Sequence, residues 1–221
     1  MKYIKLFEEF DNSSFDTIKI ILKKVGVETD TIKFLSNGSN GFALDIGGDK
    51  VLKVTNHKQE AETAAWSIEY DFRWIVKVYD VFKVKSDKPF PKRLPIRLPY
   101  WEDVYFIIEE KLQTQPVMTQ VANFLSIFVS CFNHDKIRKT GILFYLDKYK
   151  VKKYFNSNEV DLQIRETYKE VYELLYNLQT HYGLKYLDFQ SGNVGRDEKG
   201  VLKIFDVYFY RKRGDIRQIV I

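Results

Sequence analysis

The feature that most constrains the fold is a change in the spacing of apolar residues along the chain. From residue 32 to about 108, short apolar runs alternate with glycine-containing turns, which is typical of β-strands. One segment, from His57 to about Tyr70, has helical spacing instead. After Leu112 the longer periodic segments, about 117–132 and 160–182, are helical. The sequence therefore predicts an α+β protein with a strand-rich first part and a helix-rich second part.

The segments on either side of these runs extend the prediction. Residues 2–10 and 16–25 each present one apolar face at helical spacing, and Gly26 is a plausible end for the second helix. In that helix Ile18, Ile21, Leu22 and Val25 are expected to point inward. Asn56 is expected to cap the helix that begins near His57. The predicted strands are 32–35, 42–46, 50–55, 75–84 and 104–108, with a hairpin turn at 47–49, and two short strands near 193–195 and 201–205.

Composition narrows the classes of partner. The 221 residues carry a net charge of +5, which is too small to predict nucleic-acid binding. The single cysteine, Cys131, and the lack of a signal peptide favour a reducing compartment, so we expect a cytoplasmic protein. The apolar run 121–132 is too short to span a bilayer, so no membrane contact is expected. The run Arg211–Arg213 is expected to be solvated.

Three residues near the end of the chain suggest a chemistry. Asp188 and Asn193 are five residues apart, and Asp206 ends an apolar run thirteen residues later. Phosphoryl transfer needs a carboxylate near the acceptor hydroxyl and oxygen ligands that hold Mg²⁺ against nucleotide phosphates. The hairpin expected between Asn193 and Asp206 would bring these two side chains to one edge. This pattern predicts a site for Mg²⁺ and ATP.

A lysine within a predicted strand adds a candidate cation for the phosphates. Lys53 lies between Leu52 and Val54, which would face the opposite side of an alternating strand. A glutamate on the following helix would hold it. Glu60 and Glu62 are both candidates, Glu62 fits the usual offset better, and Glu69 is a weaker option.

In these residues the chain resembles the protein kinase superfamily, including its small bacterial and phage-encoded members. Ser36-x-Gly38-x-x-Gly41 resembles the glycine-rich loop, and Val51-Leu52-Lys53 the lysine strand. Residues 107–112 resemble the end of the fifth strand and the hinge. Tyr186-Leu187-Asp188 stands where the family has His-Arg-Asp, and Asp206-Val207-Tyr208 where it has Asp-Phe-Gly. Residues 1–10 also resemble short leaders of phage proteins, which would place the protein in the host cytoplasm.

The resemblance implies a role for each matching residue. Lys53 would contact the α- and β-phosphates, Glu62 would pair with it, and Asp188 would accept the proton of the acceptor hydroxyl. Asn193 and Asp206 would hold Mg²⁺. The remaining nucleotide contacts would come from the loop and the hinge: Gly38, Ser39, Gly41, Glu109, Glu110, Lys111 and Leu112.

The resemblance also implies a two-lobed fold with ATP in the cleft between the lobes. Residues 1–111 would form a first lobe with an antiparallel sheet, and residues 112–221 a reduced helical second lobe. The expected function is transfer of the γ-phosphoryl group of ATP to a hydroxyl acceptor, on a protein or a small molecule. Only 15 residues follow Asp206, which leaves no room for the family's full peptide-binding platform. Two alternatives therefore stay open: an inactive, nucleotide-binding pseudokinase, and a small-molecule kinase of the aminoglycoside or choline type.

Overall fold

The structure is a computed structural model, and it describes residues 12–37, 40–70, 72, 75–86, 104–113, 193–205 and 213–221. These residues belong to two compact units. The first unit contains the described residues 12–37, 40–70, 77–86, 104–111 and 213–221. The second contains residues 72, 75–76, 112–113 and 193–205. The helices predicted at 2–10, 117–132 and 160–182 lie outside the described residues, as does Cys131.

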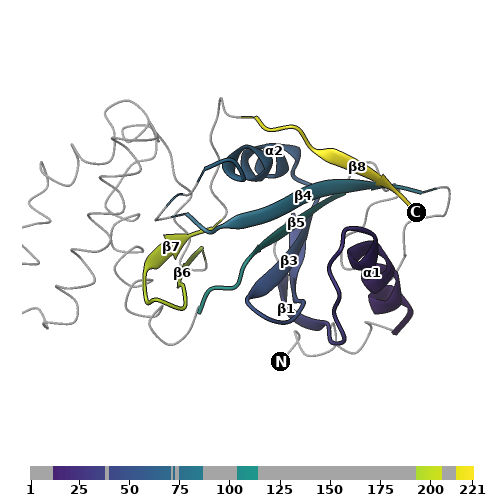
Figure 1. The fold of residues 1–221 in the computed structure, drawn as a ribbon, viewed down its shortest axis with the longest axis horizontal. Helices are drawn as coiled ribbons and strands as arrows, with labels where there is room; N and C mark the ends of the chain where they lie inside the picture. The colour runs from purple at the N-terminus through teal and green to yellow at the C-terminus, as the bar shows by residue number, and fades with distance from the viewer. Residues whose placement is uncertain are drawn as a thin grey trace, which may run out of the picture. The chain divides into compact units, whose positions relative to one another are not determined.

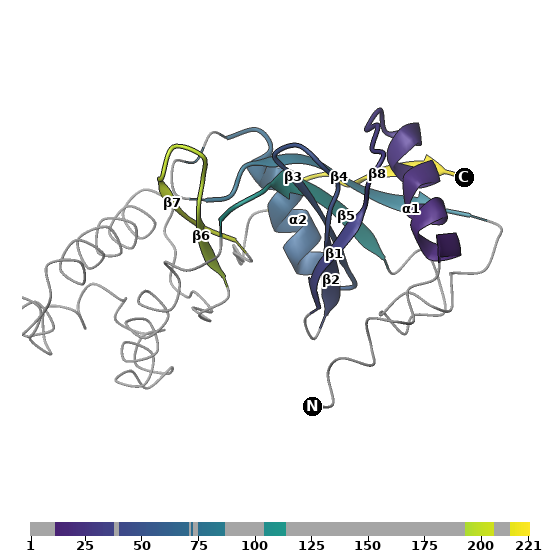
Figure 2. The ribbon, with the colours of Figure 1, turned by 90° about the horizontal axis from the view of Figure 1, so that it is seen from below.

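A six-stranded sheet forms the first unit, in the order β1-β2-β3-β5-β4-β8 (Figures 1 and 2). Its strands are β1 (Lys33–Asn37), β2 (Gly41–Asp45), β3 (Lys50–Thr55), β4 (Val78–Lys85), β5 (Tyr105–Glu110) and β8 (Arg217–Val220). Neighbouring strands from β1 to β4 run antiparallel, whereas β8 runs parallel to β4. The expected antiparallel sheet is thus corrected to a mixed one.

The two faces of this sheet have different covers, because successive side chains of a strand point to opposite faces. On one face, Leu52, Val54 and Phe106 pack with the apolar side of α1 (Asn12–Lys24) in the main core. On the other face, Val81 and Ile107 pack against α2 (Lys58–Ser67) through Ala61 and Ala65. Figure 1 shows α1 and α2 on opposite sides of the sheet. The second face has the smaller core, because α2 contributes mainly alanines to it.

The first helix matches its prediction. Ile18, Ile21 and Leu22 are fully buried, and Val25 packs against the same core. Gly26 follows the helix with a φ of 79°, in the left-handed region that glycine adopts without strain. The hairpin prediction at 47–49 is also confirmed, since Gly47 and Gly48 both have positive φ between β2 and β3.

The beginning of α2 differs from its prediction. The N-cap is His57 rather than Asn56, and no side chain caps the helix. The backbone N–H of Asn56 instead donates to the carbonyl of Asn40 at 2.9 Å. The hydroxyl of Thr55 accepts a hydrogen bond from the N–H of His57 at 3.1 Å. Thr55 therefore organises the turn that the sequence assigned to Asn56.

The strand β8 was not predicted from the sequence. It pairs with β4 from Phe82↔Arg217 to Lys85↔Val220 and forms an edge of the sheet. Ile219 and Ile221 pack against the main core, and Ile216 packs against the cluster under α2. The expectation that 112–221 as a whole forms a second domain is corrected accordingly, because residues 213–221 belong to the first unit.

The described part of the second unit centres on a hairpin of β6 (Val194–Arg196) and β7 (Leu202–Ile204). This hairpin was predicted. Ile75, expected at the start of a longer strand, instead forms a parallel bridge with Ile204. Gln113 forms an antiparallel bridge with Arg196 on the other strand of the hairpin.

Among all the residues that the structure describes, no helix is long and apolar enough to cross a membrane.

Candidate functional site

The strongest candidate for a functional group is an ion pair beneath α2. The ammonium of Lys53, on β3, pairs with the carboxylate of Glu60, in the first turn of α2. The side chains are 16% and 6% exposed, so both charges lie largely out of water. Lys53 is flanked on the neighbouring strands by Ala43 and Ile107. The ammonium thus lies on the sheet face covered by α2, where apolar neighbours offer it no compensation.

The structure corrects the partner assigned to Lys53, which is Glu60 and not Glu62. Glu62 lies 3.6 Å from the ammonium of Lys58 and 3.5 Å from Nε of Arg213. The reason is helical geometry, since two positions correspond to a rotation of about 200° around the helix axis. The buried residues of α2 are Glu60, Ala61, Thr63, Ala65 and Ser67. Glu60 lies on one stripe with Thr63 and Ser67, three and seven positions further on, whereas Glu62 is not on the buried side.

A buried threonine connects this ion pair to the preceding turn. The Thr55 hydroxyl donates to Oε2 of Glu60 at 2.9 Å, while Oε1 of Glu60 meets Lys53. Thr55 is fully buried and also lies 3.3 Å from the carbonyl oxygen of Asn40. Asn40 lies within the predicted glycine-rich loop, next to Gly41. The loop base, β3 and α2 are therefore joined by one short polar network.

Gly41 has a structural requirement of its own. A Cβ at this position would lie 2.0 Å from the carbonyl oxygen of Val54 and 2.9 Å from Cα of Thr55. The backbones of β2 and β3 approach so closely here that a side chain would force them apart. This close approach keeps Asn40 within hydrogen-bonding distance of Thr55. Gly38 and Ser39, the other predicted loop residues, lie outside the described residues.

The predicted hinge residues are largely occupied by protein contacts. The N–H of Glu110 donates to the carbonyl of Lys77 at 2.8 Å, and the N–H of Lys111 donates to that of Asp49 at 2.7 Å. Glu109 lies within β5, between β3 and β4. One of the points at which the chain crosses between the two compact units falls between Lys111 and Leu112. The chain thus passes from one unit to the other where the sequence placed the hinge. The backbone N–H groups of the hinge residues Glu110 and Lys111, however, already have protein acceptors.

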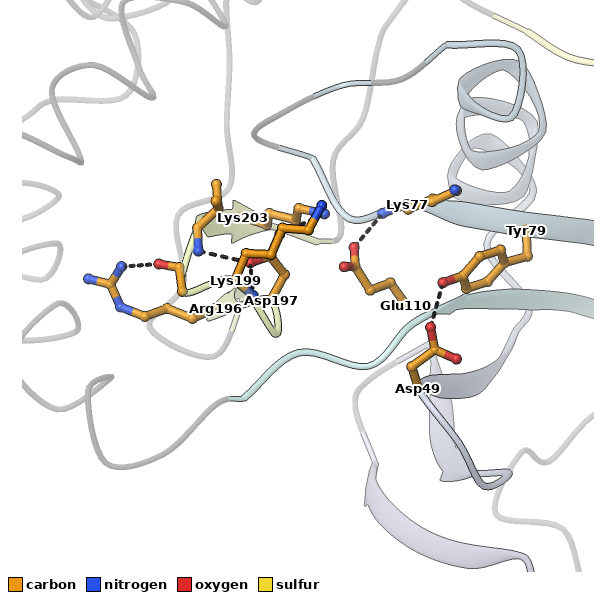
Figure 3. A network of polar contacts seen from close by, with 10 residues as sticks. Asp49, Lys77, Tyr79, Glu110, Arg196, Asp197, Lys199 and Lys203 are labelled. Carbon is orange, nitrogen blue, oxygen red and sulfur yellow. Dashed lines mark hydrogen bonds and ion pairs between the residues drawn. The ribbon is translucent and has the colours of Figure 1, made fainter.

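Side chains at this end of the sheet are paired as well. In Figure 3 the carboxylate of Glu110 accepts from the backbone N–H of Lys77, at 3.3 Å, and the Tyr79 hydroxyl donates to Asp49. The ammonium of Lys111 meets Asp45 at 2.7 Å. This hydrogen bond holds the pKa of Asp45 below its usual value, against the opposing effect of burial. The predicted cofactor residues Glu110 and Lys111 therefore have structural roles in the first unit.

In the second unit, Asn193 lies at the entrance to the hairpin. Its carbonyl accepts a hydrogen bond from the N–H of Phe205 at 3.0 Å, just beyond the pair Val194↔Ile204. The two ends of the hairpin are thus joined at Asn193 and Phe205. The next residue in the sequence is Asp206, the other predicted metal ligand. Asp206 and the predicted base Asp188 lie outside the described residues. Within the part of the chain that the structure describes, no three His, Cys, Asp or Glu side chains group to hold a metal ion.

The turn of this hairpin is organised by Asp197, which is buried. Its Oδ1 accepts hydrogen bonds from the N–H groups of Lys199 and Val201, at 2.9 and 2.8 Å, and Oδ2 lies 3.3 Å from the ammonium of Lys203 (Figure 3). Burial raises the pKa of Asp197, but the Val201 N–H, Lys203 and the Lys199 N–H together outweigh it, so the pKa lies below its usual value. Gly200 completes the turn with a φ of 77°. Asp197 therefore fixes the hairpin that carries Asn193.

Sequence reasoning missed Thr55 and favoured the wrong glutamate. Thr55 could have been found from periodicity, because it shares a strand face with Lys53. The stripe of Glu60, Thr63 and Ser67 is polar, so the choice of glutamate had no apolar signal. It also missed the contact between α2 and residues 213–214. There the signal was weaker, because charged residues surround Gly214 in the sequence.

Comparisons with known proteins find no similar sequence and only partial similarity to solved structures. No protein-family model matches the chain, and no curated protein sequence is similar to it. Solved structures that resemble it include two of thermostable mutants of an aminoglycoside phosphotransferase. One is a ternary complex with AMP-PNP and hygromycin B, at 15% identity and a TM-score of 0.31, and the match covers 48% of this chain and 34% of that one. The other is a ternary complex with ADP and hygromycin B, at 18% identity and a TM-score of 0.28, over 47% and 33% of the two chains. The matched region spans about a third of either phosphotransferase, and the low TM-scores define neither a shared fold nor a shared activity.

Proposed function

We propose that this protein is a phosphotransferase of the protein-kinase type, which binds Mg²⁺ and ATP and moves the γ-phosphoryl group to a hydroxyl acceptor. The observation that carries the proposal is the Lys53–Glu60 pair, with its hydrogen bond to Thr55. A largely buried ion pair seldom stabilises a fold more than apolar residues of the same size would. A lysine kept in such a place, beside a glycine-containing turn, is suited to holding anionic oxygens.

Each residue of the proposed site has a role. Lys53 binds the α- and β-phosphates, and Glu60 holds its ammonium in position. Asn193 and Asp206 are the proposed Mg²⁺ ligands, and the hydrogen bond between Asn193 and Phe205 supports their pairing. Bound Mg²⁺ would neutralise the charge that develops on the phosphates. Asp188 is the proposed base for the acceptor hydroxyl. The two-lobed fold is part of the same proposal, supported by the unit boundary at residues 111–112.

Among the predicted hinge residues, Leu112 is the best remaining candidate to meet the adenine. The N–H groups of Glu110 and Lys111 would have to break hydrogen bonds of 2.8 and 2.7 Å before they could bind a base. Among the described residues, none accepts a hydrogen bond from the backbone N–H of Leu112. The carbonyl of Glu109 or of Lys111 would then provide the complementary acceptor.

The proposal is tested first by nucleotide binding. Calorimetric titration of AMP-PNP with Mg²⁺ is carried out on the wild type, Lys53→Ala and Lys58→Ala. Lys58 is the matched control because its side chain is on the adjacent helix and 69% exposed. We expect Lys53→Ala to weaken binding by about tenfold or more, since a hydrogen bond to a charged group contributes roughly 1.5–3 kcal/mol. Lys58→Ala should bind as the wild type does.

Phosphoryl transfer is then measured with γ-labelled ATP and Mg²⁺, alone and with cell lysate, beside Asp188→Ala. Transfer by the wild type and its loss in Asp188→Ala would support catalysis. Nucleotide binding without any transfer would instead support the pseudokinase alternative. A wild type that binds no nucleotide would contradict both.

A further inference from the structure

Residues 213–221, here called the β8 segment, contact α2 directly. The N–H of Gly214 donates to the carbonyl of Glu62 at 2.9 Å, and Nε of Arg213 lies 3.5 Å from the Glu62 carboxylate. Ile216 packs on the cluster formed by the inner side of α2 and the sheet. Figure 1 shows this segment running beside α2 before it joins the sheet as β8.

The contact at Gly214 is too close for any side chain. A Cβ there would lie 2.2 Å from the backbone N of Trp66 and 2.4 Å from the carbonyl carbon of Ala65. Those atoms belong to the helix backbone and cannot turn aside as the end of a flexible side chain could. The β8 segment therefore lies directly on the backbone of α2.

The other end of the β8 segment is anchored to the sheet. Arg217 forms an ion pair with Asp80 on β4, and its Nε donates to Oδ1 at 3.1 Å. Its guanidinium also lies 5.7 Å from the centre of the Phe82 ring. Beyond it, the ammonium of Lys24, at the end of α1, donates to the carbonyl of Val220 at 2.8 Å. The segment is thus fixed to β4 and α1 at one end and meets α2 with residues 213–216 at the other.

Apolar packing among the described residues contributes little to the fixation of α2. The helix has 10 residues and no side-chain cap at its N-terminus. Its buried positions are small or polar residues: Glu60, Ala61, Thr63, Ala65 and Ser67. Alanine buries little apolar area, so packing against the sheet alone gives α2 little resistance to displacement. Because Glu60 is on this helix, any displacement of α2 changes the distance between Glu60 and Lys53.

We infer that the β8 segment is a positioning element for the Lys53–Glu60 pair, with Gly214 as its contact residue. Gly214 acts through α2 and touches neither charge. The segment holds the helix at the depth at which the Glu60 carboxylate reaches the Lys53 ammonium. Its meaning for catalysis rests on the proposed function, but the positioning itself does not depend on any nucleotide.

The test uses the full chain without nucleotide. In Gly214→Ala the new methyl group must displace either α2 or the β8 segment. The reactivity of Lys53 is measured by acylation with an amine-reactive ester and mass spectrometry, with the exposed Lys23 of α1 as internal reference. Amide hydrogen exchange of residues 61–67 is measured in parallel. Val220→Ala is the matched control, because that side chain is on β8 but 67% exposed.

We expect Gly214→Ala to raise both Lys53 acylation and exchange in α2 by about tenfold, as local opening of the helix becomes easier. Val220→Ala should change neither. Rates in Gly214→Ala that equal those in Val220→Ala would overturn the inference. If Gly214→Ala does not fold, the same two rates are measured in Ile216→Ala, which removes apolar contact without adding bulk. Rates above those of Val220→Ala would support the inference, and equal rates would overturn it.

A nucleotide titration separates this inference from the proposed function. If the wild type binds AMP-PNP with Mg²⁺, Gly214→Ala should bind it more weakly, and Val220→Ala should not. If the wild type binds none, the proposed function fails, whereas the acylation and exchange rates still decide whether the β8 segment positions Glu60.

Discussion

At the scale of single residues, Glu60 and Glu62 show how a helix separates two identical side chains. They are two positions apart on α2, but Glu60 is buried against Lys53, and Glu62 meets the more exposed Lys58 and Arg213. Removing one member of a largely buried pair leaves the other charge without compensation. Removing Glu62 should have a smaller effect, since its partners Lys58 and Arg213 are 69% and 76% exposed and remain in contact with water.

Neutral replacements should therefore have very different effects at the two positions. We expect Glu60→Gln to lower the free energy of unfolding by about 3 kcal/mol, because the Lys53 ammonium loses its ion pair with the Glu60 carboxylate. Glu62→Gln should lower it by less than about 1 kcal/mol. Urea unfolding at neutral pH measures both. Equal losses would show that Glu60 does not hold Lys53 as the structure has it.

The polar residues around Lys53 could be predicted only in part. The lysine strand was recognisable because Leu52 and Val54 flank Lys53, and the sheet buries both. The choice of glutamate depended on which side of α2 faces the sheet, and sequence offset alone favoured Glu62. Glu60 shares its stripe with Thr63 and Ser67, which are polar, and the alanines at 61 and 65 are only weakly apolar, so apolar periodicity does not define the inner side of α2. Thr55 shares a strand face with Lys53, but its hydrogen bond to Glu60 depends on tertiary contact.

At the scale of elements, the hairpins were the most predictable parts. Gly47 and Gly48, like Gly200, occupy positions with positive φ, so their turns follow from local sequence. The strand β8 was not predictable in this way. Arg217 and Gln218 are exposed on an edge strand, and its partner β4 is distant in the chain. Whether a segment pairs with a strand so distant in the chain depends on which edge of the sheet remains unpaired.

The hairpin of the second unit should depend on the charge of Asp197. Its pKa is depressed in the folded state, so its stabilising effect is complete above the unfolded-state pKa of about 3.9. This effect is lost as the pH falls through the lower, folded-state pKa. At neutral pH, Asp197→Asn should lower the free energy of unfolding by about 1–3 kcal/mol, because turn hydrogen bonds and the contact with Lys203 weaken.

The difference between Asp197→Asn and the wild type should shrink as the pH falls from about 5 to below the lowered pKa. Thermal unfolding across this range measures it. Asp215→Asn serves as control, because Asp215 is exposed. A difference that stays constant with pH would show that the Asp197 carboxylate is not held as described.

At the scale of the whole molecule, residues of both compact units are proposed to act on one ligand. Lys53 belongs to the first unit and Asn193 to the second. The phosphates would bind Lys53 with or without metal, whereas Asn193 would act only through Mg²⁺. The two roles therefore predict that removal of Mg²⁺ abolishes the effect of a substitution at Asn193 on nucleotide affinity but not that of a substitution at Lys53.

Nucleotide titrations with Mg²⁺ and with EDTA test this assignment. Lys53→Ala should weaken AMP-PNP binding in both conditions. Asn193→Ala should weaken AMP-PNP binding by about tenfold in Mg²⁺, because a contact with a charged group is lost. In EDTA the same substitution should leave binding unchanged. An effect of Asn193→Ala that persists in EDTA would mean that Asn193 supports the hairpin and does not hold metal.

The place of β8 in the first unit has a consequence for synthesis of the protein. Arg217 binds Asp80 across 137 residues, and Lys24 reaches Val220 across 196. The ribosome must pass Val220 before the sheet can complete its sixth strand, long after β1 to β5 have been made. Contacts of such long sequence separation form slowly, and a sheet edge that awaits its partner is prone to pair with other chains. During translation β4 should therefore be the edge at which newly made chains associate, and a chaperone that covers extended edges would protect it until β8 arrives.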